Sequence, residues 1–433
     1  MTTLREGEQL SPVAADPQSV VDLLQSLRGF EERVVVDSAE GESFVIALEQ
    51  GTYISLSASA YHLLKARRDG ASFAQLAEMF GKHSGRSIDE TEIAAAYNSL
   101  IGRIQAIQAR AQRAPAGFLF RWKLIPAAAV LRIGSWLSVA FHAATSVLLL
   151  AAVVLSVFWA SDIYKLHRFF SMGSTPSEAW WAYGLFLISV LFHEFGHASA
   201  CIRFGARPSE IGATLYLIFP AFYSDVTAAW ELRRWQRVIV DFAGVYFQAV
   251  IGVVYLALYQ VYRWESLWLA WIMIVSSSLF VLNPILKFDG YWVVADALGV
   301  TNLSQQPMRI LRHLIGKLRR DPSVKPLPWS PRVTGVLGLY TLVSFSVWFY
   351  FILYAMPRLW QYVAVYPAKL SELLGRHLAS PGRSWSADLP ELSRSTFVVI
   401  LAILLTWRLL SPHGKKIWNL VSRRQEPAVK PKP

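Results

Sequence analysis

Long runs of apolar residues, separated by short polar segments, dominate the chain from about residue 139 onward. Roughly 20 consecutive apolar residues are enough for a helix to cross the hydrocarbon core of a bilayer. Such runs predict spanning helices at 139–160, 181–202, 238–262, 267–288, 333–356 and, with the shortest apolar core, 395–411. The pattern therefore predicts a polytopic α-helical membrane protein with about six transmembrane helices.

The first part of the chain is more polar and follows another pattern. Residues 30–110 contain three short strand-like runs separated by glycine-containing turns, followed by three stretches with helical periodicity. The expected strands are 33–37, 43–48 and 52–56, and the expected helices are 57–68, 72–82 and 88–110. This order predicts a small α+β domain of the winged-helix type on the cytoplasmic side.

The other segments complete the expected organisation: a flexible lead-in at 1–29, a basic connector at 111–137, the transmembrane domain at 138–412 and a basic tail at 413–433. Lysine and arginine concentrate before the first span, in the loops 203–237 and 289–332, and in the tail. The positive-inside rule places these segments, and with them both termini, in the cytoplasm. That arrangement needs an even number of spans, which supports the weak sixth one.

Composition agrees with a membrane protein. Of the 433 residues, 54% are hydrophobic and only 17% are charged, which is too apolar for an ordinary soluble protein of this length. The net charge of +12 on its own suggests nucleic-acid binding. Because the basic residues flank apolar runs, membrane topology and contact with anionic lipid explain them, and we expect no nucleic-acid partner. The single cysteine, Cys201, excludes an internal disulfide and a cysteine-rich metal site.

The second apolar run carries a metal-binding pattern, His193-Glu194-Phe195-Gly196-His197. Two histidines four residues apart lie on one face of a helix, where both imidazoles can reach the same ion. Glu194, between them, is placed to accept a proton from a water bound to that ion. Polar residues inside lipid are costly without a function, so the membrane location strengthens this interpretation.

A catalytic zinc ion usually has three protein ligands, so a third is expected from elsewhere in the chain. Asp289 fits best, because the positive-inside topology places it at the same membrane depth as the two histidines; Asp225 and Asp241 are competitors. Asn283 is expected either to contact the substrate or an oxyanion, or to cap the helix that Pro284 interrupts. Gly290 is expected to permit an unusual backbone conformation beside the ligand and the substrate.

The pairing of the histidine motif with Asn283-Pro-Ile-Leu-Lys-Phe-Asp-Gly290 resembles the site-2 protease family of intramembrane zinc metalloproteases. The continuation to Asp296 and the stretch Phe219–Trp230 are similar to the bacterial peptide zinc metalloproteases of that family. The resemblance implies Zn²⁺ bound by His193, His197 and Asp289, with Glu194 as the catalytic base. The sequence departs from the family at Val245 and Gln248, where relatives often have proline and asparagine.

Residues 30–110 resemble the peptide-chaperone (PqqD-like) domain of pyrroloquinoline-quinone biosynthesis, also called the RiPP recognition element. The resemblance rests on the strand-turn-strand run 43–56 and on the helical segments that follow it. Domains of this family bind a leader peptide as an added strand at the edge of their sheet. The resemblance implies a captured peptide precursor as partner.

Together these features predict an integral-membrane zinc metalloendopeptidase in the bacterial inner membrane. It would cut a peptide or membrane-protein substrate near the cytoplasmic face, in peptide maturation or export, with an exporter complex as a further partner. Two alternatives remain: regulated intramembrane proteolysis of a membrane-tethered regulator, and a non-catalytic scaffold for an exporter. The intact Glu194 argues against the scaffold, which has no use for a base.

Overall fold

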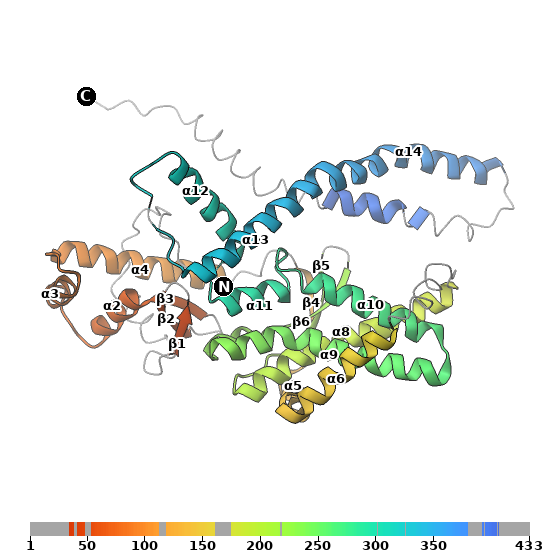
Figure 1. Ribbon diagram of the computed structural model, residues 1–433, viewed down its shortest axis with the longest axis horizontal. Helices are drawn as coiled ribbons and strands as arrows, with labels where there is room; N and C mark the ends of the chain where they lie inside the picture. The colour runs from red at the N-terminus through yellow and green to blue at the C-terminus, as the bar shows by residue number, and fades with distance from the viewer. Residues whose placement is uncertain are drawn as a thin grey trace. The chain divides into compact units, whose positions relative to one another are not determined.

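The computed structural model describes residues 34–38, 41–47, 53–111, 118–160, 175–216, 219–300, 302–324, 326–379, 392–393, 395–404 and 406 (Figure 1). The chain divides into two compact units, Met1–Leu337 and Gly338–Pro433, with the boundary inside a long helix. The lead-in at 1–29 and the tail at 413–433 lie outside the described residues.

The N-terminal elements are three strands followed by three helices. The strands pair antiparallel in the order β1-β2-β3, and all six elements lie within two residues of their expected ranges. Their bounds are β1 Val34–Ser38, β2 Gly41–Ala47, β3 Tyr53–Ser57, α2 Ala58–Arg68, α3 Phe73–Ser84 and α4 Glu90–Ala111. Serine caps begin two of the helices: Ser57 accepts a hydrogen bond from Ala60 N, and Ser72 forms a capping box with Gln75.

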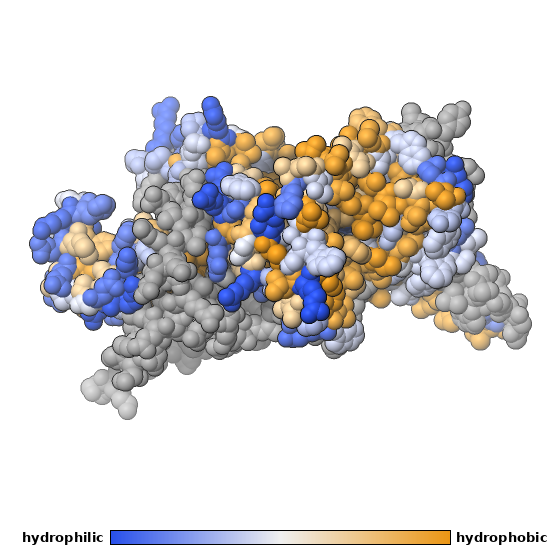
Figure 2. Space-filling view, turned by 90° about the horizontal axis from the view of Figure 1, so that it is seen from below, coloured by the Kyte–Doolittle hydropathy of each residue, from blue (hydrophilic) through white to orange (hydrophobic). Residues whose placement is uncertain are grey.

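One apolar cluster holds these elements together. Strands β2 and β3 supply one face of it, and the three helices supply the other. Its fully buried members are Ile46, Ile54, Leu56, Tyr61, Leu64, Leu76, Ile101 and Ile104. Charged side chains gather over the outer surface of α2–α4, whereas apolar side chains cover much of the visible face of the long apolar helices that follow later in the chain, called the membrane-type helices below (Figure 2).

A second sheet lies where only a connector was expected. Strand β4 (Phe118–Ile125) pairs antiparallel with β5 (Ile211–Tyr216), which pairs with β6 (Phe219–Ser224). Helix α5 (Ala127–Leu137) follows directly and is continued by a short 3-10 helix, Ser138–Phe141. The connector interpretation of 111–137 was therefore wrong for 118–137, because β4 is stabilised by a strand about ninety residues away in sequence.

Within the described residues, four helices are long and apolar enough to cross a membrane. They are Ala143–Ala160 (α6), Ser177–Phe204 (most of α8, Pro176–Phe204), Arg234–Tyr262 (α9) and Pro331–Ala379 (α13, a π-helical turn and α14). Shorter apolar helices lie at Ala127–Phe141, Glu265–Val281 and Ser395–Leu404. The mostly helical architecture and its apolar helices agree with a membrane helical protein, although the expected number of spans is not reproduced.

The expected fourth span, 267–288, is interrupted. Helix α10 (Glu265–Val281) ends before Asn283, a turn occupies 284–287, and a new helix, α11 (Asp289–Leu298), follows. Pro284 explains the break, because it has no N–H to donate and disfavours helical geometry in the residue before it. At 1.5 Å per residue the 17 residues of α10 extend about 26 Å, slightly less than the hydrocarbon thickness.

The C-terminal part also differs from expectation. The fifth span was expected to end at 356 and to lead into a loop, but the helix continues from α13 (Pro331–Tyr350) through a π-helical turn (Phe351–Ala355) into α14 (Met356–Ala379). Residues 395–404 pack beside α14, where the hydroxyls of Tyr366 and Thr396 lie 2.6 Å apart. The segment expected as the sixth span therefore packs beside the continuation of the fifth, and its end, 407–411, lies outside the described residues.

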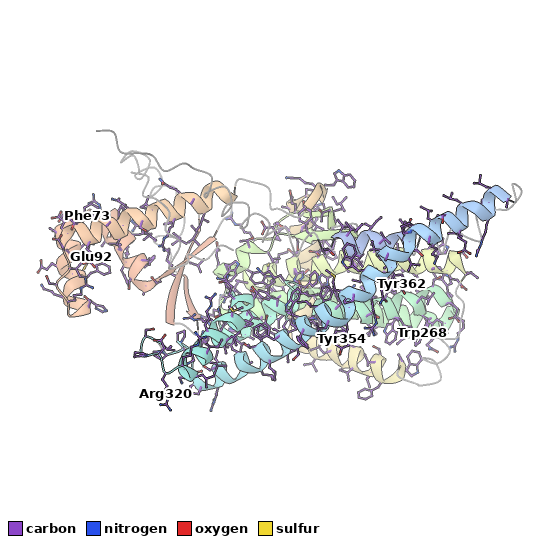
Figure 3. The ribbon with its side chains drawn as sticks, turned by 90° about the horizontal axis from the view of Figure 1, so that it is seen from above. Phe73, Glu92, Trp268, Arg320, Tyr354 and Tyr362 are labelled. Atoms are coloured by element: carbon purple, nitrogen blue, oxygen red, sulfur yellow. The ribbon has the colours of Figure 1, made fainter. Side chains whose placement is uncertain are left out.

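Helices α8, α9 and α10 form the centre of the membrane-type region. Small residues let α8 and α9 approach closely: a Cβ at Gly196 would lie 2.3 Å from the backbone oxygen of Ala243. Tyr255 of α9 donates a hydrogen bond of 2.9 Å to Leu185 O of α8. On α10, Trp268 (labelled in Figure 3) stacks on Trp271.

We predict that truncation of the N-terminal core unfolds that part of the chain selectively. Leu64→Ala removes a side chain with no exposed surface, so it should cost about 2–5 kcal/mol. Met79→Ala is the matched control, because Met79 is 49% exposed. Limited proteolysis of the full-length protein should cut within residues 30–110 faster in Leu64→Ala than in Met79→Ala. Equal rates in the two variants would contradict the assigned core.

Candidate metal centre

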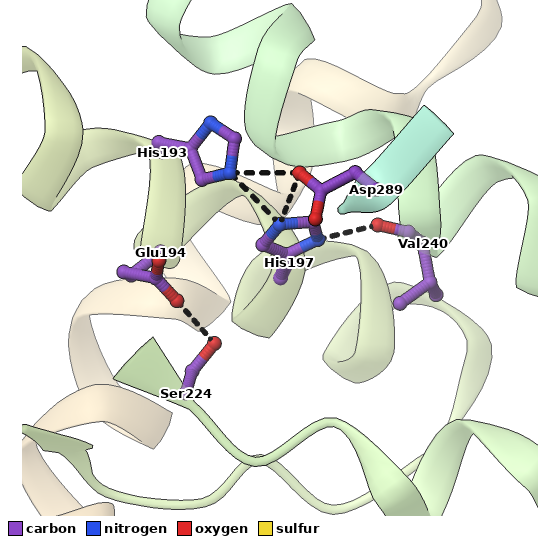
Figure 4. Close-up of polar contacts among 6 residues, drawn as sticks. All are labelled: His193, Glu194, His197, Ser224, Val240 and Asp289. Carbon is purple, nitrogen blue, oxygen red and sulfur yellow. Dashed lines mark hydrogen bonds and ion pairs between the residues drawn. The ribbon is translucent and has the colours of Figure 1, made fainter. Parts of the chain in front are cut away.

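Three side chains from two separate helices converge at one point (Figure 4). His193 and His197 lie one turn apart on α8, and Asp289 is the first residue of α11. The Oδ2 atom of Asp289 lies 2.9 Å from His193 Nε2 and 3.3 Å from His197 Nε2, and the two Nε2 atoms are 3.2 Å apart. The structure thus brings together the two histidines and the carboxylate that the sequence singled out.

The donor set fits a zinc ion. Asp289 Oδ2 is buried and accepts no hydrogen bond of normal geometry, although two imidazoles lie beside it. Two imidazole nitrogens and one carboxylate oxygen, within 4.8 Å of one another, are donor types that zinc binds in catalytic sites. A cation between them would satisfy the oxygen and both nitrogens together.

His197 is oriented by its other ring nitrogen, because Nδ1 lies 2.7 Å from the backbone oxygen of Val240 on α9. A hydrogen bond of this kind fixes the ring and leaves Nε2 directed toward the other donors.

Helix α9 passes so close to the imidazoles that only glycine fits at the contact. A Cβ added to Gly244 would lie 2.4 Å from Nε2 of both His193 and His197. The backbone of α9 therefore forms one wall of the centre.

Glu194 lies beside the centre rather than in it. Its carboxylate is nearly buried, and its Oε2 accepts a hydrogen bond of 2.8 Å from Ser224 Oγ (Figure 4). Ser224 is the last residue of β6, so the second sheet reaches the site through this contact. Sequence reasoning quoted Ser224 within a family-like stretch but gave it no role; no local pattern links it to a residue thirty positions earlier.

The competitors for the third donor lie elsewhere. Asp225 is exposed, and its Oδ1 accepts a hydrogen bond of 2.9 Å from Thr227 N. Asp241 has a buried oxygen without a hydrogen-bond partner, but it is outside the group formed by His193, His197 and Asp289. Asp289 is therefore the carboxylate that the structure places with the two histidines.

The two residues expected to bind substrate have clear structural contacts. Asn283 accepts a hydrogen bond of 2.9 Å from Ile285 N through its side-chain oxygen, so it caps the turn after α10. Gly290 is buried within α11, and a Cβ there would lie 2.1 Å from Leu282 O. The expectation of an unusual backbone at Gly290 was wrong, because its φ is not positive; glycine is needed for the close approach of α11 to the end of α10.

A buried ion pair fixes α11 to α9. Arg237 donates a hydrogen bond of 2.9 Å to Asp296 Oδ1, and its other terminal nitrogen donates to Leu232 O at 3.2 Å. The guanidinium also lies over the ring of Trp230, 5.1 Å from its centroid. Because Asp289 begins the helix that Asp296 anchors, this pair restrains the position of the third donor. Neither residue was assigned a role from sequence.

Comparison with known proteins gives one relevant match. The chain is similar to the Bacillus subtilis (strain 168) protein named "Putative peptide zinc metalloprotease protein YydH", with 29% identity over 122 residues. The match covers 28% of this chain and 48% of that protein, so the chain spans about half the length of its relative. No protein-family model and no solved structure matches the chain. This distant similarity supports a zinc metalloprotease.

We predict that Gly244→Ala lowers metal affinity while Gly184→Ala does not. The new methyl group would force the imidazoles apart, and misoriented ligands typically weaken metal binding about 10–100-fold. Gly184 is the matched control, because it also lies in a membrane-type helix and its Cβ would meet no atom within 4 Å. The measurement is zinc retained by each purified protein against a graded chelator; equal retention would contradict the placement of α9 against the imidazoles.

Proposed function

We propose that this protein is an integral-membrane zinc metalloendopeptidase of the site-2 protease type. The observation that carries the proposal is the convergence of His193, His197 and Asp289 within apolar helices, with the carboxylate of Glu194 beside them. A distant relative named as a peptide zinc metalloprotease supports the same chemistry.

His193, His197 and Asp289 would hold the ion. Zinc bound there would supply a Lewis acid that acidifies water and polarises a carbonyl. The other steps fall to side chains. Glu194 accepts a proton from the attacking water at a carboxylate oxygen and delivers it to the nitrogen of the leaving amine as the C–N bond breaks.

The second sheet suggests how a substrate is presented. In the order β4-β5-β6, one edge of β6 has no neighbouring strand among the described residues. An extended peptide that pairs with this edge would lie beside Ser224 and hence beside Glu194. This fits the chemistry, because a peptide bond inside a helix is shielded by its own turns.

Asn283 would donate hydrogen bonds to the substrate through its side-chain N–H groups, since its side-chain oxygen already accepts one from Ile285 N. Gly290 would hold Asn283 near Asp289 through close packing.

We place the protein in the bacterial inner membrane, with both termini and the catalytic centre toward the cytoplasm. The long apolar helices and the basic residues between them support this location. The substrate would be a peptide or a membrane protein cut near the cytoplasmic face.

Residues 30–110 would act as a PqqD-like domain that captures the substrate. The sheet β1-β2-β3 has β1 and β3 at its edges, where a leader peptide could be added as a further strand. Capture there would raise the local concentration of a peptide precursor at the membrane. A role in peptide maturation or export, beside an exporter, follows from this arrangement.

Two other functions remain as alternatives. Regulated intramembrane proteolysis of a membrane-tethered regulator would use the same centre on another substrate. A non-catalytic scaffold for an exporter would keep the fold without the chemistry. The hydrogen bond that holds Glu194 favours an enzyme, because a scaffold has no need to orient a base.

Replacement of the base should separate metal binding from catalysis. We predict that Glu194→Gln retains zinc, because Glu194 is outside the donor group, and loses about 10²–10⁴-fold in cleavage rate. The measurement is zinc content and peptide cleavage by the detergent-purified protein, with a precursor peptide encoded near this gene as substrate. Cleavage by Glu194→Gln at the wild-type rate would rule out the assigned base.

The third donor can be tested with two aspartates. Asp289→Ala should reduce zinc below one ion per chain, because it removes one of three ligands. Asp225→Ala should leave zinc unchanged, since Asp225 is exposed and bonded to Thr227. Metal analysis of both variants decides the matter: full zinc in Asp289→Ala with loss in Asp225→Ala would reverse the assignment.

Ser224 should matter for catalysis rather than for substrate binding. We predict that Ser224→Ala lowers kcat about 10–100-fold, because a hydrogen bond to a charged group contributes about 1.5–3 kcal/mol and about 1.4 kcal/mol corresponds to a factor of ten. Ser224→Thr keeps the hydroxyl and should restore most of the rate. If both variants cleave like wild type, the contact does not orient the base.

A further inference from the structure

Helix α12 (Gln306–Leu318) presents an apolar face that none of the preceding chemistry uses. Met308, Leu311, Leu314, Ile315 and Leu318 fall within about 120° of its surface at 3.6 residues per turn. Four of them, all except Leu311, are 40–85% exposed. We call these five residues the α12 stripe.

The opposite side of α12 is already packed. On that side, Val324 lies so close to Gly316 that a Cβ there would be 2.4 Å from it. Two residues nearer the stripe are also buried: Ile310, about 40° beyond one edge, and Pro307, which lies within the arc of the stripe at the first turn of the helix. Trp329 is buried as well, with the guanidinium of Arg309 5.0 Å from its ring centroid. The segment after the helix thus folds back over one face and leaves the α12 stripe uncovered within the described residues.

Basic side chains border the stripe. Arg312 lies about 40° beyond one edge and Lys317 about 60° beyond the other, and Arg319 and Arg320 follow at the C-terminal end (Figure 3 labels Arg320). None of these four forms a salt bridge with another described residue. Asp321 is the one acidic residue in 303–332, and its carboxylate accepts hydrogen bonds from Ser323.

We infer that α12 lies in the headgroup region of the bilayer, with the α12 stripe in the acyl chains and its basic border on anionic phospholipid. A bilayer matches both features, because it offers hydrocarbon and negative charge at adjoining depths. A second copy of this chain fits poorly, since it would bring Arg312, Lys317 and Arg319 against equally basic surfaces. The chain position agrees: α12 lies between two apolar helices, α10 and α13. The inference rests on the proposed membrane location and not on the proposed peptidase activity.

Site-specific fluorescence on the full-length protein in vesicles tests the inference. Cys201 is buried, so an environment-sensitive thiol probe would report on an introduced cysteine. Leu314→Cys probes the stripe, and His313→Cys is the matched control on the opposite side of the same turn. Leu148→Cys, on the exposed surface of α6, reports whether the protein is inserted at all.

In vesicles of phosphatidylcholine with phosphatidylglycerol, we expect a lipid-borne quencher to reduce emission at positions 148 and 314 but not at 313. Omission of phosphatidylglycerol, or the triple change Arg312→Gln, Lys317→Gln and Arg319→Gln, should weaken quenching at 314 and leave quenching at 148 unchanged.

Quenching at 148 without quenching at 314 would overturn the inference alone, whereas no quenching at 148 would overturn the membrane location with it. Equal quenching at 314 with and without phosphatidylglycerol would refute the role of the charges. Protection at 314 that grows with protein density would identify a second copy instead.

Discussion

Two imidazoles and a carboxylate placed among apolar helices must satisfy one another, because little else nearby can do so. Unpaired polar groups in such surroundings cost several kcal/mol each. His193, His197 and Asp289 meet this constraint by converging within 3.3 Å, in a geometry that a cation would complete. The break that Pro284 causes after α10 lets a new helix begin at Asp289, and this places the Asp289 carboxylate beside the two histidines.

Helix α9 organises the surroundings of this centre. Arg237, Val240, Gly244 and Gln248 recur every three or four residues, so they share one face of the helix. Along that face Arg237 holds Asp296 of α11, Val240 O fixes the ring of His197, Gly244 admits the imidazoles, and Gln248 donates a hydrogen bond of 3.2 Å to Ser189 of α8. One helix therefore sets the relative position of α8 and α11, and with it the distance between the donors. Such rigid support is what a catalytic metal site needs.

Sequence reasoning found what is local or strongly periodic. Patterns within short stretches predict the N-terminal strands and helices and the long apolar helices. The pairing of the histidine motif with Asp289 is predicted because the two segments are expected at the same depth in the membrane. Sequence reasoning missed contacts between distant segments: β4 is a strand because it pairs with β5, and Ser224 reaches Glu194 only when β6 folds against α8. It also misjudged helix ends. Residues 357–379 are amphipathic rather than uniformly apolar, so hydropathy did not reveal that the helix continues. The reason for a glycine at position 290 was also misjudged: backbone freedom was expected, whereas the close approach of α11 to the end of α10 requires it.

The central claim is that one zinc ion is held by two imidazoles and a carboxylate inside these helices. The most direct test is zinc analysis of the full-length protein together with its X-ray absorption spectrum at the zinc edge. The account predicts one zinc per chain, with imidazole nitrogens and oxygens as neighbours at about 2.0–2.2 Å. Absence of zinc, or a sulfur neighbour at about 2.3 Å, which only Cys201 or a methionine could supply, would contradict it.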